Sequence, residues 1–535
     1  MEGKSSFLQG AFILTLAGII VKIIGATYRI PLTRFIGKEG IGLYQMAYPI
    51  YNIMFVISTG GIPLAISKLV AEKVALGDGK GTQRVLRVSV LLLTITGLIF
   101  SLFLLLSAKF IAVNILSDPR AYYSLLAVAP AVFFVAVMSA FRGFFQGLQT
   151  MIPTAVSQIT EQIVRVITIM ALAYLLMPKG IEFAAAGATF GAATGGIASL
   201  IVLLAIYFRN KRQLNDFFRS INTVKHTESG KSIMSRLIIQ AIPITIGQLV
   251  MPVMQFIDSA IVPSRLQAGG FTISQSTELY GQLTGEATTL INFPTMITVA
   301  LAASLVPTIS EAYAQKNLVL IKERSAIAVR LSILLCLPSF IGLCVLSTEI
   351  MTMLYKDAAA GPILAVLSAS ALFLGLHQTL SGVLQGLGKT AIPVKNMFIG
   401  SIFKIIVSYV FTAIPAVNVR GAALGTVVGF AVSSLLNLLT IRKIIGFKLE
   451  VGSMVVKPVI AVVIMAFVTK GFYLIAFDLL GSNSLSTLVA ILVGALVYGL
   501  SLLAVGGIKE EDLLFLPKIG PKLARILKKL RLLRG

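Results

Sequence analysis

Long apolar stretches, separated by short polar connections, run along the whole chain. Fourteen of them approach or exceed the roughly 20 residues that an α-helix needs to cross the hydrocarbon core of a bilayer. They lie at about 7–30, 41–71, 88–108, 121–147, 155–177, 183–208, 237–264, 284–313, 327–347, 361–386, 394–416, 421–441, 457–477 and 486–507. Alternation with a period of two residues is absent, so a membrane-spanning barrel is excluded. The pattern predicts an all-α polytopic membrane protein of about 14 transmembrane helices.

Two parts of this pattern repeat each other. The stretch 138–170, MSAFRGFFQGLQTMIPTAVSQITEQIVRVITIM, returns in outline at 378–407 after a spacing of 239–240 residues. The matched positions are Gln146-Gly147-Leu148 with Gln385-Gly386-Leu387, Pro153 with Pro393, and Arg165 with Lys404. A second match, at a spacing of 238 residues, pairs Gly187 and Gly191 with Gly425 and Gly429. The paired glycines are expected to permit close helix packing. Because each copy holds an even number of spans, the two halves should have the same orientation in the membrane.

The repeat and the longest hydrophilic connection divide the chain. We expect an N-terminal six-helix lobe at 1–208, a basic cytoplasmic linker at 209–236 and a C-terminal six-helix lobe at 237–441. Two further transmembrane helices should occupy 442–507, and a basic amphipathic cytoplasmic tail 508–535. The tail is either an interfacial helix on the anionic inner leaflet or a solvated basic segment.

Composition and charge exclude several classes of protein. With 535 residues, 57% of them hydrophobic and 12% charged, and a mean hydropathy of +0.93, the chain is not a soluble domain. The net charge of +24 could indicate a nucleic-acid partner. However, thirty Lys and Arg residues fall in the connections on one side of the predicted membrane and nine on the other. This asymmetry predicts that both termini are cytoplasmic and explains the charge without nucleic acid.

Motifs for cofactors or catalysis are missing from the sequence. Cys336 and Cys344 lie within one apolar segment, and two histidines without a cysteine cluster make a metal site unexpected. Gly388-Lys389-Thr390 resembles the end of a P-loop, but Val383 occupies the required first glycine position. We therefore expect neither an enzyme nor a bound cofactor, with energy from an ion gradient, the membrane potential or product consumption.

Ionisable residues occur inside spans near the repeated turn. At membrane depth such a group costs at least about 2.5–3.5 kcal/mol, so these side chains should face protein or water. Glu161 and Arg165 have the i, i+4 spacing of an intrahelical ion pair, and Arg142 lies on the preceding helix. Two interpretations stay open. The pair is structural, or Glu161 releases Arg165 to a phosphate when substrate enters.

Further polar faces are candidates for lining a cavity. On the first span Lys22 and Arg29 share a face with Thr15 and form either a cationic wall or a pair of side chains reaching the membrane interface. Lys404 adds a cation in the second half. Two other helix faces carry polar side chains at shared positions: Tyr44, Tyr48, Tyr51 and Asn52 on the second span, and Gln240, Gln248, Gln255 and Asp258 on the seventh. The tyrosines stack on sugar rings or form an interfacial belt, and the glutamines line a cavity or hydrogen-bond another helix.

These features together resemble a known family. The 6+6+2 helix pattern and the duplicated turn are similar to the multidrug/oligosaccharidyl-lipid/polysaccharide (MOP) exporter superfamily. Within it, RFIGKEGIGLYQMAYPIY (34–51), GIPLAISKLVAE (61–72), FRGFFQGLQTMIPTAVSQITEQIVR (141–165) and KGIEFAAAGA (179–188) resemble the branch of stage V sporulation protein B and YtgP, which is similar to the MurJ flippases. The resemblance implies two lobes around a cavity that opens alternately to each side of a bacterial plasma membrane.

The resemblance also implies a substrate, an undecaprenyl-pyrophosphate-linked cell-wall precursor such as lipid II. MurJ proteins carry essential basic residues on their first helix, and Lys22 and Arg29 are the nearest matches here. The further arginines of those relatives on helices two and eight are absent from VISTGGIPLAIS and INFPTMITVALAAS. The alternatives are a flippase for another lipid-linked polysaccharide, a cation-coupled multidrug exporter, and a membrane scaffold for wall-synthesis proteins. We expect a monomer.

Overall fold

The computed structural model describes residues 2–221, 223, 228–447, 450–507 and 525, without the side chains of residues 2–12, 15 and 26. Every regular element within these ranges is helical, which confirms the all-α prediction. Thirteen helical stretches among the described residues are long and apolar enough to cross a membrane. The first of them, Leu16–Ala75, is 60 residues long and contains two of the fourteen predicted spans, so the two descriptions agree.

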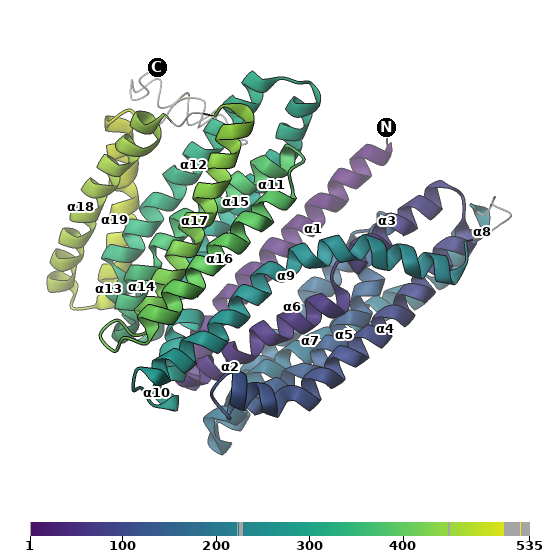
Figure 1. Cartoon of the computed structure of the whole chain (residues 1–535), viewed down its shortest axis with the longest axis horizontal. Helices are drawn as coiled ribbons and strands as arrows, with labels where there is room; N and C mark the ends of the chain where they lie inside the picture. The colour runs from purple at the N-terminus through teal and green to yellow at the C-terminus, as the bar shows by residue number, and fades with distance from the viewer. Residues whose placement is uncertain (1, 222, 224–227, 448–449, 508–524, 526–535) are drawn as a thin grey trace. The chain divides into compact units, whose positions relative to one another are not determined.

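The chain divides by its contacts into two compact units (Figure 1). Unit 1 comprises Met1–Gln267 and Phe271–Gly281, and unit 2 comprises Ala268–Gly270 and Gln282–Gly535. The helices of unit 1 are α1 (Glu2–Thr27), α2 (Arg29–Thr59), α3 (Ile62–Ala75), α4 (Gly79–Phe110), η1 (Ile111–Ile115), α5 (Ala121–Gly147), α6 (Ile152–Leu176), η2 (Met177–Lys179), α7 (Ile181–Arg209), α8 (Lys211–Ser220), α9 (Gly230–Ala268, whose last residue belongs to unit 2) and α10 (Ile273–Gly281). Those of unit 2 are η3 (Gln282–Ala287), α11 (Thr288–Ala314), α12 (Leu318–Val345), α13 (Ser347–Tyr355), η4 (Ala358–Ala360), α14 (Gly361–Leu367), α15 (Ala369–Gly386), α16 (Ala391–Thr412), α17 (Arg420–Ile445), η5 (Gly452–Val456), α18 (Lys457–Leu480) and α19 (Asn483–Ala504).

The seventh predicted span, α9, makes its described contacts within unit 1. The amide of Gly61 donates to Thr245 Oγ1 at 3.0 Å, and Arg236 pairs with Glu72 at 2.7 Å. The predicted lobe 237–441 instead counts this helix with the second repeat. The predicted lobes are defined by the sequence repeat, whereas the units are defined by contacts between residues. The predicted lobes therefore stay a prediction. The predicted tail, 508–535, lies outside the described residues except for Arg525.

A cluster of charges ties the start of α9 to α3. The Glu228 carboxylate accepts hydrogen bonds from Ser232 at 2.5 Å and from Arg236 at 3.0 Å, and it pairs with Lys73 at 3.1 Å. These donors lower the pKa of Glu228, the hydrogen bond from Ser232 contributing most. Lys73 also contacts Asp78 at 3.2 Å, and Asp78 caps the N-terminus of α4. The segment after residue 227 is therefore anchored to two helices of unit 1.

Glycines allow α6 and α7 to pack closely. A Cβ added to Gly191 would lie 2.9 Å from the Arg165 carbonyl oxygen, and one added to Gly195 would lie 2.8 Å from that of Glu161. In unit 2, a Cβ at Gly425 would lie 2.9 Å from the Lys404 carbonyl oxygen. The predicted packing role of the repeated glycines is confirmed. The spacing of α6 and α7 also fixes where Glu161 and Arg165 lie.

Gly195→Ala is expected to destabilise the protein by about 1–3 kcal/mol, because its methyl group meets the backbone of α6. Gly18→Ala is the matched control, since no atom lies within 4 Å of the added Cβ. It should be neutral or gain up to about 1 kcal/mol from helix propensity. The measurement is the thermal unfolding midpoint in detergent. Equal shifts in both variants would contradict the packing argument.

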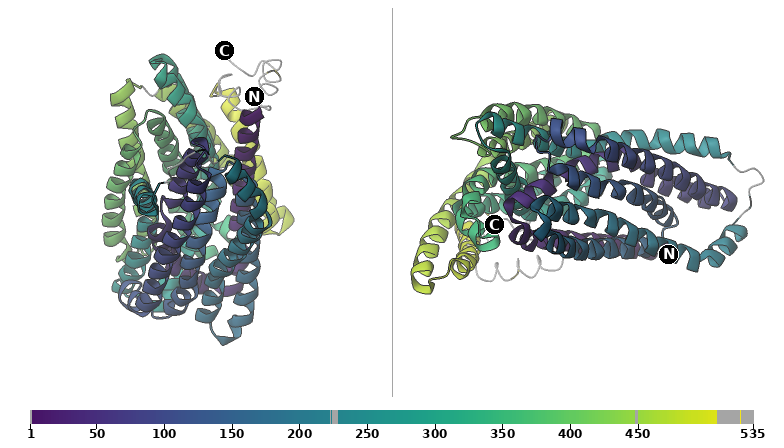
Figure 2. Two further views of the ribbon diagram at one scale, coloured as in Figure 1. Left: turned by 90° about the vertical axis from the view of Figure 1, so that its right-hand side faces the viewer. Right: turned by 90° about the horizontal axis from the view of Figure 1, so that it is seen from below.

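The two helices beyond the repeat pack on each other and on their own unit. α18 and α19, yellow in Figures 1 and 2, lie side by side in all views. Lys470 of α18 pairs with Glu349 of α13 at 2.5 Å. The Tyr498 hydroxyl of α19 donates to the Leu334 carbonyl of α12 at 2.9 Å. The predicted pair of extra helices is thus an integral part of unit 2.

Candidate functional site

The candidate site in unit 1 is built around a carboxylate shared by two guanidinium groups. Glu161 of α6 accepts a hydrogen bond from Arg165 at 2.5 Å through Oε1 and one from Arg142 of α5 at 2.9 Å through Oε2. The three side chains are only 14–17% exposed. The predicted i, i+4 pair and the approach of Arg142 from the neighbouring helix are confirmed. One negative and two positive charges leave the cluster with a net charge of +1.

Arg142 is held in place by two buried serines that the sequence analysis missed. Its Nε donates to Ser157 Oγ of α6 at 3.0 Å, and its Nη2 donates to Ser199 Oγ of α7 at 3.1 Å. Both serines are fully buried. Arg142 therefore joins α5, α6 and α7 and positions Glu161 as part of the same network.

Arg165 keeps a donor that the protein does not use. Its Nε is buried and has no acceptor among the described residues, whereas its Nη2 is bound to Glu161. Tyr48 and Tyr51 of α2 lie close enough to interact electrostatically with its guanidinium. A buried guanidinium with an N–H group that lacks an acceptor is suited to donate a hydrogen bond to an additional anionic oxygen.

A row of tyrosines on α2 faces this cluster. The ring centroids of Tyr44 and Tyr48 are 5.1 Å apart and those of Tyr48 and Tyr51 are 5.7 Å apart. The Tyr44 and Tyr28 hydroxyls share a hydrogen bond of 2.9 Å. Tyr44 is 1% and Tyr51 is 5% exposed, so these two rings pack inside unit 1. The predicted shared face is confirmed, with Asn52 half-buried beside it.

The two predicted cations of the first span differ in their surroundings. α1 ends at Thr27, so Lys22 lies on α1 while Arg29 is the first residue of α2. Arg29 is half-buried and interacts electrostatically with Tyr28, Tyr44 and Tyr48. Lys22 is exposed and has no hydrogen bond or ion pair to a described residue. Arg29 therefore adjoins the tyrosine row, whereas Lys22 presents a solitary charge on the surface of unit 1.

The remaining candidates are on α9 and in unit 2. Gln248 and Gln255 are exposed on α9, and Asp258 is half-buried on the same helix. Lys404 is 6% exposed in unit 2, on α16 beside Gly429 of α17. The structure brings none of these four residues into the described contacts of the Glu161 cluster. Their predicted role in lining a cavity stays a prediction.

Unit 2 contains a network of uncharged polar side chains. Several of its positions correspond, through the sequence repeat, to positions of the Glu161 cluster in unit 1. With the spacing of 239 that joins Arg165 to Lys404, Ser381 matches Arg142 and Asn396 matches Ser157. The Asn437 amide of α17 donates to His377 Nδ1 at 3.2 Å and to Ser381 at 3.3 Å, and accepts from Asn396 at 2.8 Å. When the two copies are aligned on the repeated glycines, Asn437 of the second copy corresponds to Ser199 of the first. Extending the glycine register would have revealed both Ser199 and Asn437 from the sequence.

The described residues contain no group of three or more His, Cys, Asp or Glu side chains placed to hold a metal ion. Cys336 and Cys344 are both free thiols.

The fold is that of a class of multispan membrane proteins with solved structures. A solved multidrug resistance MATE family transporter of the MOP superfamily, inward-facing, matches with a TM-score of 0.68 at 14% identity, over 82% of this chain and 98% of that one. The lipid II flippase MurJ in an inward closed conformation matches with a TM-score of 0.67 at 18% identity, over 92% and 98%. At these identities the likeness shows the fold alone.

Sequence comparisons show the family. Residues 7–313 match the family described as polysaccharide biosynthesis protein, and residues 284–410 match the MatE family. Stage V sporulation protein B of Bacillus subtilis is 33% identical, over 98% of this chain and all of that protein. Lipid II flippase MurJ of the same organism is 28% identical, over 92% and 94%. The chain belongs to the polysaccharide biosynthesis protein family of the MOP superfamily, in the branch of stage V sporulation protein B and MurJ.

Proposed function

We propose that this protein is a flippase that moves an undecaprenyl-pyrophosphate-linked cell-wall precursor, lipid II, from the inner to the outer leaflet by alternating access. The observation that carries the proposal is the buried Nε of Arg165, a donor without an acceptor beside a carboxylate already shared with Arg142. A pyrophosphate oxygen would satisfy that donor. The relative named lipid II flippase MurJ supports the same substrate class.

The charge balance supports an anionic ligand. Arg142 and Arg165 stand against the single carboxylate of Glu161 in the cluster. An exporter of organic cations favours the opposite balance, because a cation entering a net positive site is repelled. The tyrosine rings supply flat apolar faces with hydroxyl groups, which suit sugar rings.

Unit 2 offers an apolar surface for the lipid part of such a substrate. A groove of about 480 Å³ lies between α11, α12, α18 and α19, with walls that include Phe293, Pro338, Leu343 and Ile491. Its lining is apolar apart from Ser339, Thr469 and Tyr498. A polyprenyl chain gains roughly 25 cal/mol for each Å² of apolar surface that it buries. A scaffold that moves no lipid has no need of either the groove or the cationic cluster.

The proposed setting is a bacterial plasma membrane with both termini cytoplasmic, and the working form is a monomer beside other wall-synthesis proteins. The protein acts as a transporter and catalyses no covalent step. It needs no bound cofactor. Its energy comes from an ion gradient, the membrane potential or consumption of the flipped product.

A precursor-accessibility measurement in depleted cells tests the function. Depletion is expected to raise the fraction of lipid-linked precursor that faces the cytoplasm, because synthesis continues while export stops. Lipid II and another polyprenyl-linked saccharide are distinguished by mass spectrometry of the accumulated species. Drug sensitivity with an unchanged precursor distribution would instead indicate a multidrug exporter. Rescue by a protein that lacks the cluster charges would indicate a scaffold.

A further inference from the structure

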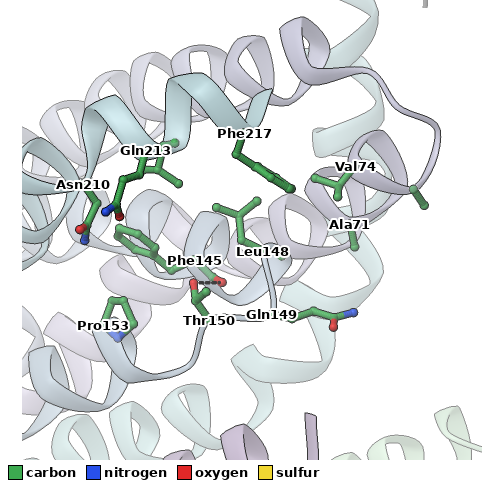
Figure 3. A pocket seen from close by; sticks show the side chains of 13 residues that line it. Ala71, Val74, Phe145, Leu148, Gln149, Thr150, Pro153, Asn210, Gln213 and Phe217 are labelled. Atoms are coloured by element: carbon green, nitrogen blue, oxygen red, sulfur yellow. Dashed lines mark hydrogen bonds between the residues drawn. The ribbon is translucent and has the colours of Figure 1, made fainter. Parts of the chain in front are cut away.

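A second pocket lies in unit 1, away from the arginine cluster. It occupies about 670 Å³ where the turn between α5 and α6 meets α8 and the end of α3 (Figure 3). Phe145, Leu148 and Pro153 come from the repeated turn, and Gln213 and Phe217 come from α8. The volume is within the range of about 300–1,000 Å³ that is typical of small-molecule sites. The transport site proposed above leaves this turn without a role.

The turn holds a glutamine in a conformation that favours glycine. Gln149 has a φ of 59°, in the left-handed region, at the rim of the pocket. The matching position in the second copy, 239 residues later, is Gly388 with a φ of 74°. The backbone adopts the left-handed conformation in both copies, and a non-glycine residue adopts it only at a cost in free energy. The first copy therefore keeps a glutamine, with a side chain at the pocket, where the second copy has a glycine.

Three amide side chains line the pocket, and two of them, Gln149 and Gln213, are exposed. Those of Gln149, Asn210 and Gln213 make no hydrogen bond to a residue that the structure describes. Each can donate and accept. The rest of the lining is apolar or aromatic except for Thr150, and no charged residue contributes to it. Such a lining suits a neutral ligand that has hydroxyl and amide groups together with small apolar groups.

We propose that this pocket binds the N-acetylhexosamine part of a glycolipid headgroup, an inference that rests on the proposed function. An acetamido group offers one donor, one acceptor and a methyl group, which match the amides and the apolar wall of Leu148, Leu214 and Val74. A phosphate would find no cationic side chain in this lining. α8 belongs to the basic segment 209–236, so the pocket lies at the end of unit 1 predicted to face the cytoplasm. It would hold the sugar where the precursor is loaded.

Saturation-transfer NMR on the full-length protein in detergent tests the site, with N,N′-diacetylchitobiose as the probe. Cellobiose, which has hydroxyl groups in place of the acetamido groups, is the matched control ligand. Chitobiose should give signals at its acetamido methyl groups and cellobiose should give none. Gln149→Gly and Gln213→Leu should each raise the Kd for chitobiose about five- to tenfold, as expected for one lost hydrogen bond. Gln149→Gly should leave the Tm unchanged or higher, because glycine relieves the backbone.

Lys109→Gln is the control, because this exposed lysine at the end of α4 is not part of the pocket lining, and the variant should bind chitobiose like the unmodified protein. Equal binding of the two disaccharides, or an unchanged Kd in both amide variants, would overturn the proposal. The test also separates this site from the proposed function. Chitobiose binding together with a normal precursor distribution after depletion would retain the pocket and overturn the flippase. An altered precursor distribution after depletion, without chitobiose binding, would retain the flippase and overturn the pocket.

Discussion

Glu161→Gln is expected to lower the amount of folded protein in the membrane sharply. The change leaves the guanidinium groups of Arg142 and Arg165 without the carboxylate that they share. Removing one partner from a buried ion pair costs about 3–5 kcal/mol, because the remaining charge is left uncompensated. Here two charges lose the same partner. The measurements are membrane abundance by immunoblot and the unfolding midpoint of purified protein.

Charge-reversal variants form the control. If the i, i+4 pair were isolated, Glu161→Arg with Arg165→Glu would restore abundance. The structure adds Arg142, which would then face a guanidinium at position 161, so this double variant should remain poorly abundant. Adding Arg142→Glu reverses all three charges and should recover part of the abundance without recovering transport. Full recovery by the double variant alone would show that Arg142 does not belong to the network.

Lys22→Gln is expected to abolish transport while leaving membrane abundance near normal. Lys22 is exposed on α1 and has no hydrogen bond or ion pair within the described residues, so its removal breaks no contact that supports the fold. A contact between an ionised donor and a phosphate is worth roughly 1.5–3 kcal/mol, so its loss reduces affinity about 10- to 100-fold. The measurement is rescue of growth and of precursor distribution in a depletion strain.

Lys22→Arg should retain most of the rescue, since it preserves the charge. Lys109→Gln, which removes an exposed lysine at the end of α4, should rescue fully. If Lys22→Gln also rescued fully, no charge would be needed at this position and Lys22 would have to be removed from the site. The proposal for Arg165 would stand independently of that result.

Local features of this protein could be predicted from the sequence. The α5 span was predicted at 121–147, the bounds that the structure gives, because long apolar runs end at turn residues. The Glu161–Arg165 contact follows from helical periodicity on one element. The tyrosine face of α2 follows in the same way, with its ring contacts confirmed.

Features that depend on how helices rotate against each other could not be predicted. Ser157 reaches Arg142 from α6, and serine inside an apolar helix most often carries no special signal. The boundary between α1 and α2 at Tyr28 lies within one continuous apolar run, and the backbone there stays helical. The contacts of α9 with α3 depend on the close approach at Gly61 and Thr245, which lie 184 positions apart. Sequence spacing contains no information on such an approach.

The arrangement of the Glu161 cluster has a consequence for how the chain enters the membrane during synthesis. Glu161 and Arg165 are on one helix, so α6 can neutralise its own charges as soon as that helix forms. α5 brings in Arg142 without a counter-charge of its own, and an isolated arginine opposes insertion. Only residues 148–151 separate the two helices. We therefore expect α5 and α6 to enter the lipid together as one hairpin, in which Glu161 can pair with Arg142.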